Sequence, residues 1–178
     1  MSAVLKPVEY RELLLGSGGR QHKAIVMDGM AKEFSRLTTL DVLPEHNPDV
    51  VHDLTMMPMP FDTDTFDEIH AYEVLEHCGR QGDWRLFFRQ FEEFWRILKP
   101  DGWFCASVPL WDSEWAWADP GHTRVIAPKT LMFLERPFYD LVGKDARSDY
   151  RPVYRGDFRV RAMQEKDQHF FFAMQAIK

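Results

Sequence analysis

The chain has 178 residues, of which 45% are hydrophobic and 28% are charged, a size and composition typical of one compact globular domain with a substantial core. Its formal net charge is −6 and its Lys and Arg residues are spread along the chain, which argues against a nucleic-acid partner because no positive field would attract a phosphate backbone. The cysteines, Cys78 and Cys105, lack Cys-x-x-Cys spacing, and no apolar run approaches the roughly 18 residues that span a bilayer. We therefore expect residues 1–178 to form a single domain of a cytoplasmic protein without membrane contact.

Short apolar runs predict the strands of the first half of the chain. Three leucines at 13–15 stop at a glycine turn, and residues 66–72 alternate in the way a half-buried strand does. A short helix is predicted at 30–34, between the first and second strands. The predicted strands of this half are 13–15, 37–40, 50–52 and 66–72.

The clearest predicted element is a helix that begins at Trp84. Its apolar residues recur at intervals of three, four and seven positions and form one stripe as far as Leu98, with Asp83 as the expected N-cap. A proline and a glycine within residues 99–102 end the helix and turn the chain into a strand at 103–109.

The last third of the chain predicts a short helix at 128–134 and then two β-rich runs, 153–162 and 168–177, separated by residues 163–167. Strands that alternate with crossovers and end in a hairpin predict an α/β fold. The expected architecture is a Rossmann-like, mostly parallel sheet with helices on both faces and a C-terminal antiparallel hairpin.

Small and acidic residues stand where four of the predicted strands end. Gly16, Ser17 and Gly18 follow the first strand, and three carboxylates, Asp41, Asp53 and Glu73, follow the next three. Ligands of such sheets bind along the carboxyl ends of the strands, so we expect these residues to converge on one site.

These segments resemble the class I S-adenosylmethionine-dependent methyltransferases from about residue 11 to about residue 135. The resemblance is carried by Leu-Leu-Leu-Gly-Ser-Gly-Gly at 13–19, Leu-Asp-Val at 40–42, Pro-Phe-Asp at 60–62, Ala-Tyr-Glu-Val-Leu-Glu-His at 71–77 and Arg-Ile-Leu-Lys-Pro-Asp-Gly at 96–102. Asp-Pro-Gly-His-Thr-Arg at 119–124 is similar to a segment of one poorly characterised branch. The resemblance implies S-adenosylmethionine as the cofactor and in-line transfer of its methyl group.

The resemblance also implies roles at the first two strand ends. A glycine turn at 16–18 would let the backbone approach the methionine part of the cofactor, or it is simply a tight strand-to-helix turn. Asp41 would accept hydrogen bonds from the ribose hydroxyls, as an acid after the second strand does in dinucleotide folds. The alternative for Asp41 is a solvated turn residue.

At the next two strand ends, Asp53 would accept from the adenine amino group, with Val42 and Leu54 as apolar faces for the ring. The alternative for Asp53 is an Asx-turn residue before a proline-rich loop. Glu73 would meet the amino group or the sulfonium region of the cofactor, or would cap the segment that follows it.

Two features depart from the family pattern. Leu14 and Leu15 stand before Gly16, where an acidic residue is usual, and this predicts a weaker hold on the cofactor. The span between Gly19 and Asp41 is also too short for the usual full-length helix, which predicts a shallower pocket on that side.

Methyl transfer mainly requires alignment of the acceptor with the methyl carbon and exclusion of water. If the acceptor must lose a proton, the candidates near the predicted pocket are His122, His77 and Tyr72, each with a structural alternative. Arg124 would fix an anionic acceptor, or it is an ordinary surface arginine.

Three tryptophans follow the fifth predicted strand. They would form a lid or contact the acceptor, or they pack over the hydrophobic core. They are Trp111, Trp115 and Trp117.

The sequence lacks the residue patterns of other enzyme classes. Gln21 stands where a nicotinamide fingerprint has its third glycine, there is no Asn-Pro-Pro-aromatic motif, and the histidines show no recognised ligand spacing, so no metal is predicted. Two hypotheses of different class follow. The chain is a methyltransferase that acts on a small-molecule or protein acceptor, or it is a relative that binds the cofactor or a partner protein without turnover.

Overall fold

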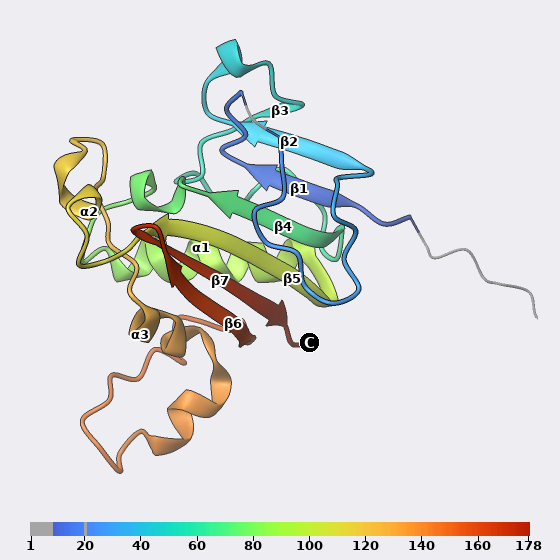
Figure 1. The fold of residues 1–178 in the computed structure, drawn as a ribbon. Helices are drawn as coiled ribbons and strands as arrows, with labels where there is room; N and C mark the ends of the chain where they lie inside the picture. Colours follow the sequence, from blue (N-terminus) through green and yellow to red (C-terminus); the bar gives the residue numbers. More distant parts are fainter. Residues whose placement is uncertain (1–8, 20) are drawn as a thin grey trace, which may run out of the picture.

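The computed structural model describes residues 9–19 and 21–178, and its seven strands form one sheet in the order β3-β2-β1-β4-β5-β7-β6 (Figure 1). The strands are β1 Glu12–Leu15, β2 Leu37–Asp41, β3 Val50–Val51, β4 Phe66–Tyr72, β5 Leu98–Pro109, β6 Phe158–Lys166 and β7 His169–Ala176. The α-helices are α1 Trp84–Ile97, α2 Trp115–Ala118 and α3 Pro128–Leu131, and the 3-10 helices are η1 Pro44–His46, η2 Leu75–His77, η3 Met132–Leu134 and η4 Arg136–Leu141.

Strands β3, β2, β1, β4 and β5 pair in parallel, and β7 pairs antiparallel with both β5 and β6. Leu15 of β1 lies opposite Leu40 of β2 and Ala71 of β4, so the carboxyl ends of these three strands meet at one edge. The predicted parallel sheet and its C-terminal antiparallel hairpin are confirmed.

Helix α1 packs on one face of the sheet (Figure 1). Leu13, Ile69 and Phe104 point to this face and join the buried aromatic stripe of α1 in one core. The predicted cap is confirmed, because the Asp83 carboxylate accepts from the backbone N–H of Leu86 at 3.1 Å and satisfies an amide of the first helical turn.

The opposite face of the sheet is covered by residues 21–36, which form no helix. Helices on both faces were expected, but α1 is the only α-helix longer than four residues in the described chain. The helix predicted at 30–34 is wrong because tertiary contacts override local propensity: Lys23 donates to the Ala31 carbonyl, and Phe34 packs edge-on against His70.

The boundaries of β5 and β6 differ from the prediction, and β6 begins at Phe158 rather than at residue 153. Residues 99–102 belong to β5 rather than to a separate turn, and they bulge from the ladder where the register with β4 shifts after Leu98. In the C-terminal hairpin, β6 runs on to Lys166 because Asp167 and Gln168 form the turn, both with positive φ (49° and 64°) as in a two-residue type I′ turn. Within the described residues, no helix has the length and apolar character needed to cross a membrane.

Candidate functional site

The glycine turn after β1 joins the ends of β1 and β2. The backbone N–H of Ser17 donates to the Leu40 carbonyl at 3.2 Å, and that of Gly18 donates to Asp41 Oδ2 at 2.9 Å. The sequence-predicted neighbours Gly16, Ser17, Gly18 and Asp41 therefore lie together at the carboxyl edge of the sheet.

A cavity of about 480 Å³ opens beside this turn, and its volume falls in the range of about 300–1,000 Å³ that is usual for ligand pockets. It is lined by the turn 16–19, by Tyr72 and Glu73 at the end of β4, and by Ser107 and His169 from β5 and β7. His22 and Ala24 close it on the side of residues 21–36. We refer to it as the glycine-turn cavity.

Glu73 faces this cavity with a φ of +52°, in the left-handed region, because the chain turns sharply at the end of β4. Its Oε1 accepts from Ser107 Oγ at 2.6 Å, and its Oε2 lies 3.6 Å from His169 Nε2. Ser107 and His169 were not singled out in the sequence, since pairing of β5 with β4 brings Ser107 to Glu73 and pairing of β7 with β5 brings His169 there.

Asp41 is buried, and its carboxylate already has three partners. These are the N–H groups of Gly18 and Leu43, each at 2.9 Å, and His46 Nδ1 at 3.1 Å. Burial raises the pKa of Asp41, but the hydrogen bonds outweigh it and leave the pKa below its ordinary value. Asp41 thus stays ionised and holds the glycine turn in place.

Asp53 and Leu54, which follow β3, are placed differently from the strand ends of β1 and β4. Asp53 accepts from the backbone N–H and the hydroxyl of Thr55, each at 2.8 Å, which is the Asx-turn alternative. Leu54 is buried in the core, whereas Val42, the other residue predicted to face adenine, is 56% exposed. None of these three lines the glycine-turn cavity, and Asp41 adjoins it only through its hydrogen bond to Gly18.

The two outer glycines of the turn differ in what surrounds them. Both have positive φ, +59° at Gly16 and +48° at Gly18. A Cβ at Gly16 would come within 2.4 Å of Val74 Cγ2, whereas a Cβ at Gly18 would meet nothing within 4 Å. Gly16 therefore permits close packing within the protein, and Gly18 borders open space.

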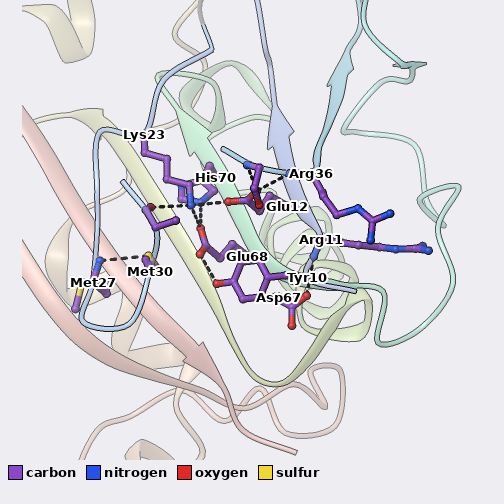
Figure 2. Close-up of polar contacts among 12 residues, drawn as sticks. Tyr10, Arg11, Glu12, Lys23, Met27, Met30, Arg36, Asp67, Glu68 and His70 are labelled. Carbon is purple, nitrogen blue, oxygen red and sulfur yellow. Dashed lines mark hydrogen bonds and ion pairs between the residues drawn. The ribbon is translucent and has the colours of Figure 1, made fainter. Parts of the chain in front are cut away.

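A buried charged cluster lies under residues 21–36 (Figure 2). Lys23 Nζ lies 2.5 Å from Glu12 Oε1 and 2.7 Å from Glu68 Oε2, and all three side chains are inaccessible to solvent. Glu12 also accepts from the N–H groups of Ser35 and Arg36, at 2.7 and 3.1 Å. The cluster thus pins both ends of the irregular segment to β1 and β4.

The cluster reaches the glycine-turn cavity through His70. His70 Nε2 lies 2.7 Å from Glu68 Oε2, its Nδ1 lies 2.6 Å from the Tyr72 hydroxyl, and that oxygen accepts from the Ile25 N–H at 3.2 Å. Burial lowers the pKa of His70, so the ring is neutral, with its Nε2–H donating to Glu68 and Tyr72 donating to Nδ1. This series of hydrogen bonds fixes the orientation of the Tyr72 side chain.

The charged cluster predicts a steep loss of stability in acid. Burial raises the pKa of Glu68, but hydrogen bonds from His70, Lys23 and Tyr10 outweigh it and lower the pKa to about 2. A carboxyl group with a depressed folded-state pKa contributes stability that is complete above its unfolded pKa and disappears as the pH falls to the folded pKa. Urea unfolding should therefore show the free energy of unfolding falling between pH 5 and pH 2, with a shallower slope in Glu68→Gln. The matched control, Glu165→Gln on the exposed end of β6, should keep the wild-type slope.

The remaining predicted residues gather away from the glycine-turn cavity. His77 and His122 lie together, with their ring centroids 4.7 Å apart, beside the buried carboxylate of Glu76. Burial raises the pKa of Glu76 to about 8. Arg124 is buried rather than at the surface, and its Nη1 and Nη2 donate to Gln90 Oε1 and the Leu75 carbonyl, at 2.8 and 3.0 Å.

The tryptophans after β5 are exposed rather than buried over the core. Trp111 is 48% exposed, and Trp115 and Trp117 on α2 are 60% and 70% exposed. None of them lines the glycine-turn cavity.

A family model described as a methyltransferase domain matches residues 14–106, which is more than half of the chain and runs from the end of β1 into β5. The chain belongs to the class I S-adenosylmethionine-dependent methyltransferases. The family that the sequence resembles is thereby confirmed. No curated protein matches the chain in sequence.

Several solved structures are similar to this fold at low sequence identity. A S-adenosylmethionine-dependent methyltransferase from Archaeoglobus fulgidus is 14% identical, with 93% of this chain and 86% of that chain covered and a TM-score of 0.58. The complex between the Haloferax volcanii Trm112 methyltransferase activator and a protein described as a methyltransferase gives 17% identity, 97% and 85% coverage and a TM-score of 0.57. The [4+2]-cyclase SpnF gives 12% identity, 94% and 74% coverage and a TM-score of 0.56.

Proposed function

We propose that residues 1–178 act as a single methyltransferase domain that binds S-adenosylmethionine in the glycine-turn cavity and transfers its methyl group to a small-molecule or protein acceptor. The observation that supports this most is the cavity itself. It opens at the carboxyl ends of β1 and β4, where parallel sheets bind ligands, and most of its lining residues belong to the segment 14–106 that matches the methyltransferase domain.

The residues around the cavity suit such a cofactor. Gly18 borders open space that a side chain would fill, and Glu73 offers a carboxylate to an ammonium group. Glu73 would thus take the place of the acid that this chain lacks before Gly16. Asp41, which is ionised beneath the turn, would accept from the ribose hydroxyls with the lone pairs that its backbone partners leave.

When bound, the cofactor supplies an electrophilic methyl group on a sulfonium sulfur. The protein's own contribution is to hold the acceptor in line and to exclude water. Tyr72 lines the cavity, and burial keeps its pKa above the ordinary value, so its hydroxyl stays protonated and serves as a positioning group rather than a base. The proposal therefore needs an acceptor that does not depend on Tyr72 to remove a proton.

A second candidate function is cofactor or partner binding without turnover. It is favoured by Leu14 and Leu15 before Gly16 and by the irregular segment 21–36, whose residues His22 and Ala24 close the cavity. The solved relatives include a cyclase, so the fold alone does not require methyl transfer. Another is described in complex with a methyltransferase activator, and the exposed Trp115 and Trp117 offer this chain an aromatic surface for a protein.

We expect S-adenosylhomocysteine to bind the chain with a micromolar Kd, and Asp41→Ala to weaken that binding by about 1.5–3 kcal/mol through loss of a charge-assisted acceptor. Calorimetry measures both values. Asp140→Ala, which changes an exposed carboxylate on η4, should bind as the wild type does.

Asp41 also supports the glycine turn, so its substitution could weaken binding indirectly. A thermodynamic cycle that combines Asp41→Ala with the 2′-deoxy analogue of S-adenosylhomocysteine separates a direct contact with the ribose from this structural role. If Asp41 accepts from the ribose, the wild type prefers the parent ligand and Asp41→Ala does not. An equal preference in both proteins would refute the ribose contact. Radiolabelled methyl transfer from S-adenosylmethionine to an acceptor in small-molecule and protein fractions then distinguishes the enzyme from the binder.

A further inference from the structure

Glu76, His77 and His122 form a compact cluster beyond the carboxyl end of β4. Glu76 and His77 end the 3-10 helix η2, and His122 comes from the loop after α2, about 45 positions later in the chain. Each residue offers one ligand atom, and these atoms all lie within 4.8 Å of one another. This is the residue set of a two-histidine, one-carboxylate metal site.

The carboxylate of Glu76 has unused binding capacity. Its side chain is 3% exposed, and neither Oε1 nor Oε2 has a hydrogen-bond partner among the described residues. A buried carboxylate without partners is costly, and in native proteins such a group usually meets a cation or an ordered polar partner. The nearest nitrogen is His122 Nε2, 4.0 Å from Oε1.

Both imidazoles are held in the orientation that metal-bound histidines adopt. His77 Nδ1 lies 3.0 Å from the Gly121 carbonyl, and His122 Nδ1 lies 2.8 Å from the Trp115 carbonyl. A carbonyl oxygen can only accept, so Nδ1 is the donor at both positions, and the tautomer that metal binding requires, with the lone pair on Nε2, is the one these contacts select.

Arg124 does not neutralise the carboxylate by a direct contact. Its Nη1 and Nη2 donate to Gln90 and to the Leu75 carbonyl, and it forms no ion pair with Glu76 within the described chain. Asp119 adds a second carboxylate, with Oδ2 3.8 Å from His122 Nε2. The surroundings of the cluster are thus acidic, with a half-exposed entrance at Asp119 and His77.

We propose that Glu76 and the Nε2 atoms of His77 and His122 bind one divalent transition-metal ion of the zinc class. Nitrogen ligands favour such an ion over Ca²⁺ or Mg²⁺, which prefer oxygen. Metal–ligand bonds of about 2.0–2.1 Å require the three ligand atoms to move together by roughly 1 Å from their separations in this structure. The bound ion joins η2, which follows β4, to the loop that carries α2.

The test titrates the tag-free, chelator-treated full chain with Zn²⁺ by calorimetry and with Co²⁺ by visible absorption. We expect one ion per chain, a Co²⁺ d–d band, and a rise in Tm on addition of Zn²⁺. Glu76→Gln and His122→Gln should each weaken binding by about a hundredfold or more, because loss of even an outer-shell partner costs about 10–100-fold.

Two controls keep the test decisive. Glu76→Gln replaces a buried carboxyl group that lacks a hydrogen-bond partner with an amide of nearly the same shape, so the metal-free variant should be about as stable as the wild type, and lost binding then cannot be explained by unfolding. His52→Gln changes a histidine after β3 and should bind as the wild type does. If Zn²⁺ does not bind, or if it binds the Glu76→Gln and His122→Gln variants as tightly as the His52→Gln control, the metal site is refuted.

The outcome is independent of the methyltransferase proposal, because the measurement uses no methyl donor and the three ligands lie outside the lining of the glycine-turn cavity. Loss of cofactor binding with intact Zn²⁺ binding would count against the proposed function alone. The reverse pattern would count against the metal site alone.

Discussion

Replacing Lys23 by methionine should lower the free energy of unfolding by about 3–5 kcal/mol, because it leaves two buried carboxylates without the cation between them. Lys23 Nζ contacts both Glu12 and Glu68, and the three side chains are inaccessible to solvent. Methionine keeps most of the volume of the lysine side chain, so the decrease in the free energy of unfolding measures the loss of the charge and not the creation of a cavity. Urea unfolding at pH 7 measures it.

Two comparisons separate the charge from other effects. Lys144→Met, on the exposed segment after η4, should change stability by no more than about 0.5 kcal/mol. The triple variant Lys23→Met, Glu12→Gln, Glu68→Gln should regain much of the loss, since a buried ion group replaced as a whole is often tolerated. A loss below 1 kcal/mol in Lys23→Met, or no recovery in the triple variant, would show that the cluster is hydrated.

The sequence predicts the strand that carries this charged cluster but not the burial of the cluster. In β4, Glu68, His70 and Tyr72 alternate with Ile69 and Ala71, a period of two that places three polar side chains on one face. The pattern was sufficient to predict the strand. It did not reveal that the polar face is buried, because the cover comes from residues 21–36, which have no periodicity and are held by tertiary contacts.

The residues of the candidate site were also predictable only in part. The glycine turn, Asp41 and Glu73 were predictable because each directly follows a strand, and parallel strands bring their carboxyl ends to one edge. Asp53 follows β3, yet its carboxylate is used by the local turn. The approach of Glu76 to His122 was not predictable, because it depends on the path of a loop that lies 45 positions away and has no strand to set its register.

The largest effect expected at the candidate site itself is that of Gly16→Ala. The left-handed φ of +59° costs a non-glycine residue about 1–2 kcal/mol. The new Cβ would also lie 2.4 Å from Val74 Cγ2 and 2.8 Å from Val74 Cβ, and such overpacking typically costs a further 1–3 kcal/mol. We therefore expect a loss of about 2–5 kcal/mol in the free energy of unfolding, measured with urea.

Gly18→Ala is the matched control, because Gly18 also has positive φ but its Cβ would meet nothing within 4 Å. It should cost only the backbone strain. Val74→Ala should restore part of the stability of Gly16→Ala, since it removes the Cγ2 contact and leaves the strain. Equal losses at both glycines would mean that backbone conformation alone selects Gly16. A larger loss at Gly16 with partial rescue would instead show that this glycine lets β1 pack against the chain after β4, which carries Glu73 into the cavity.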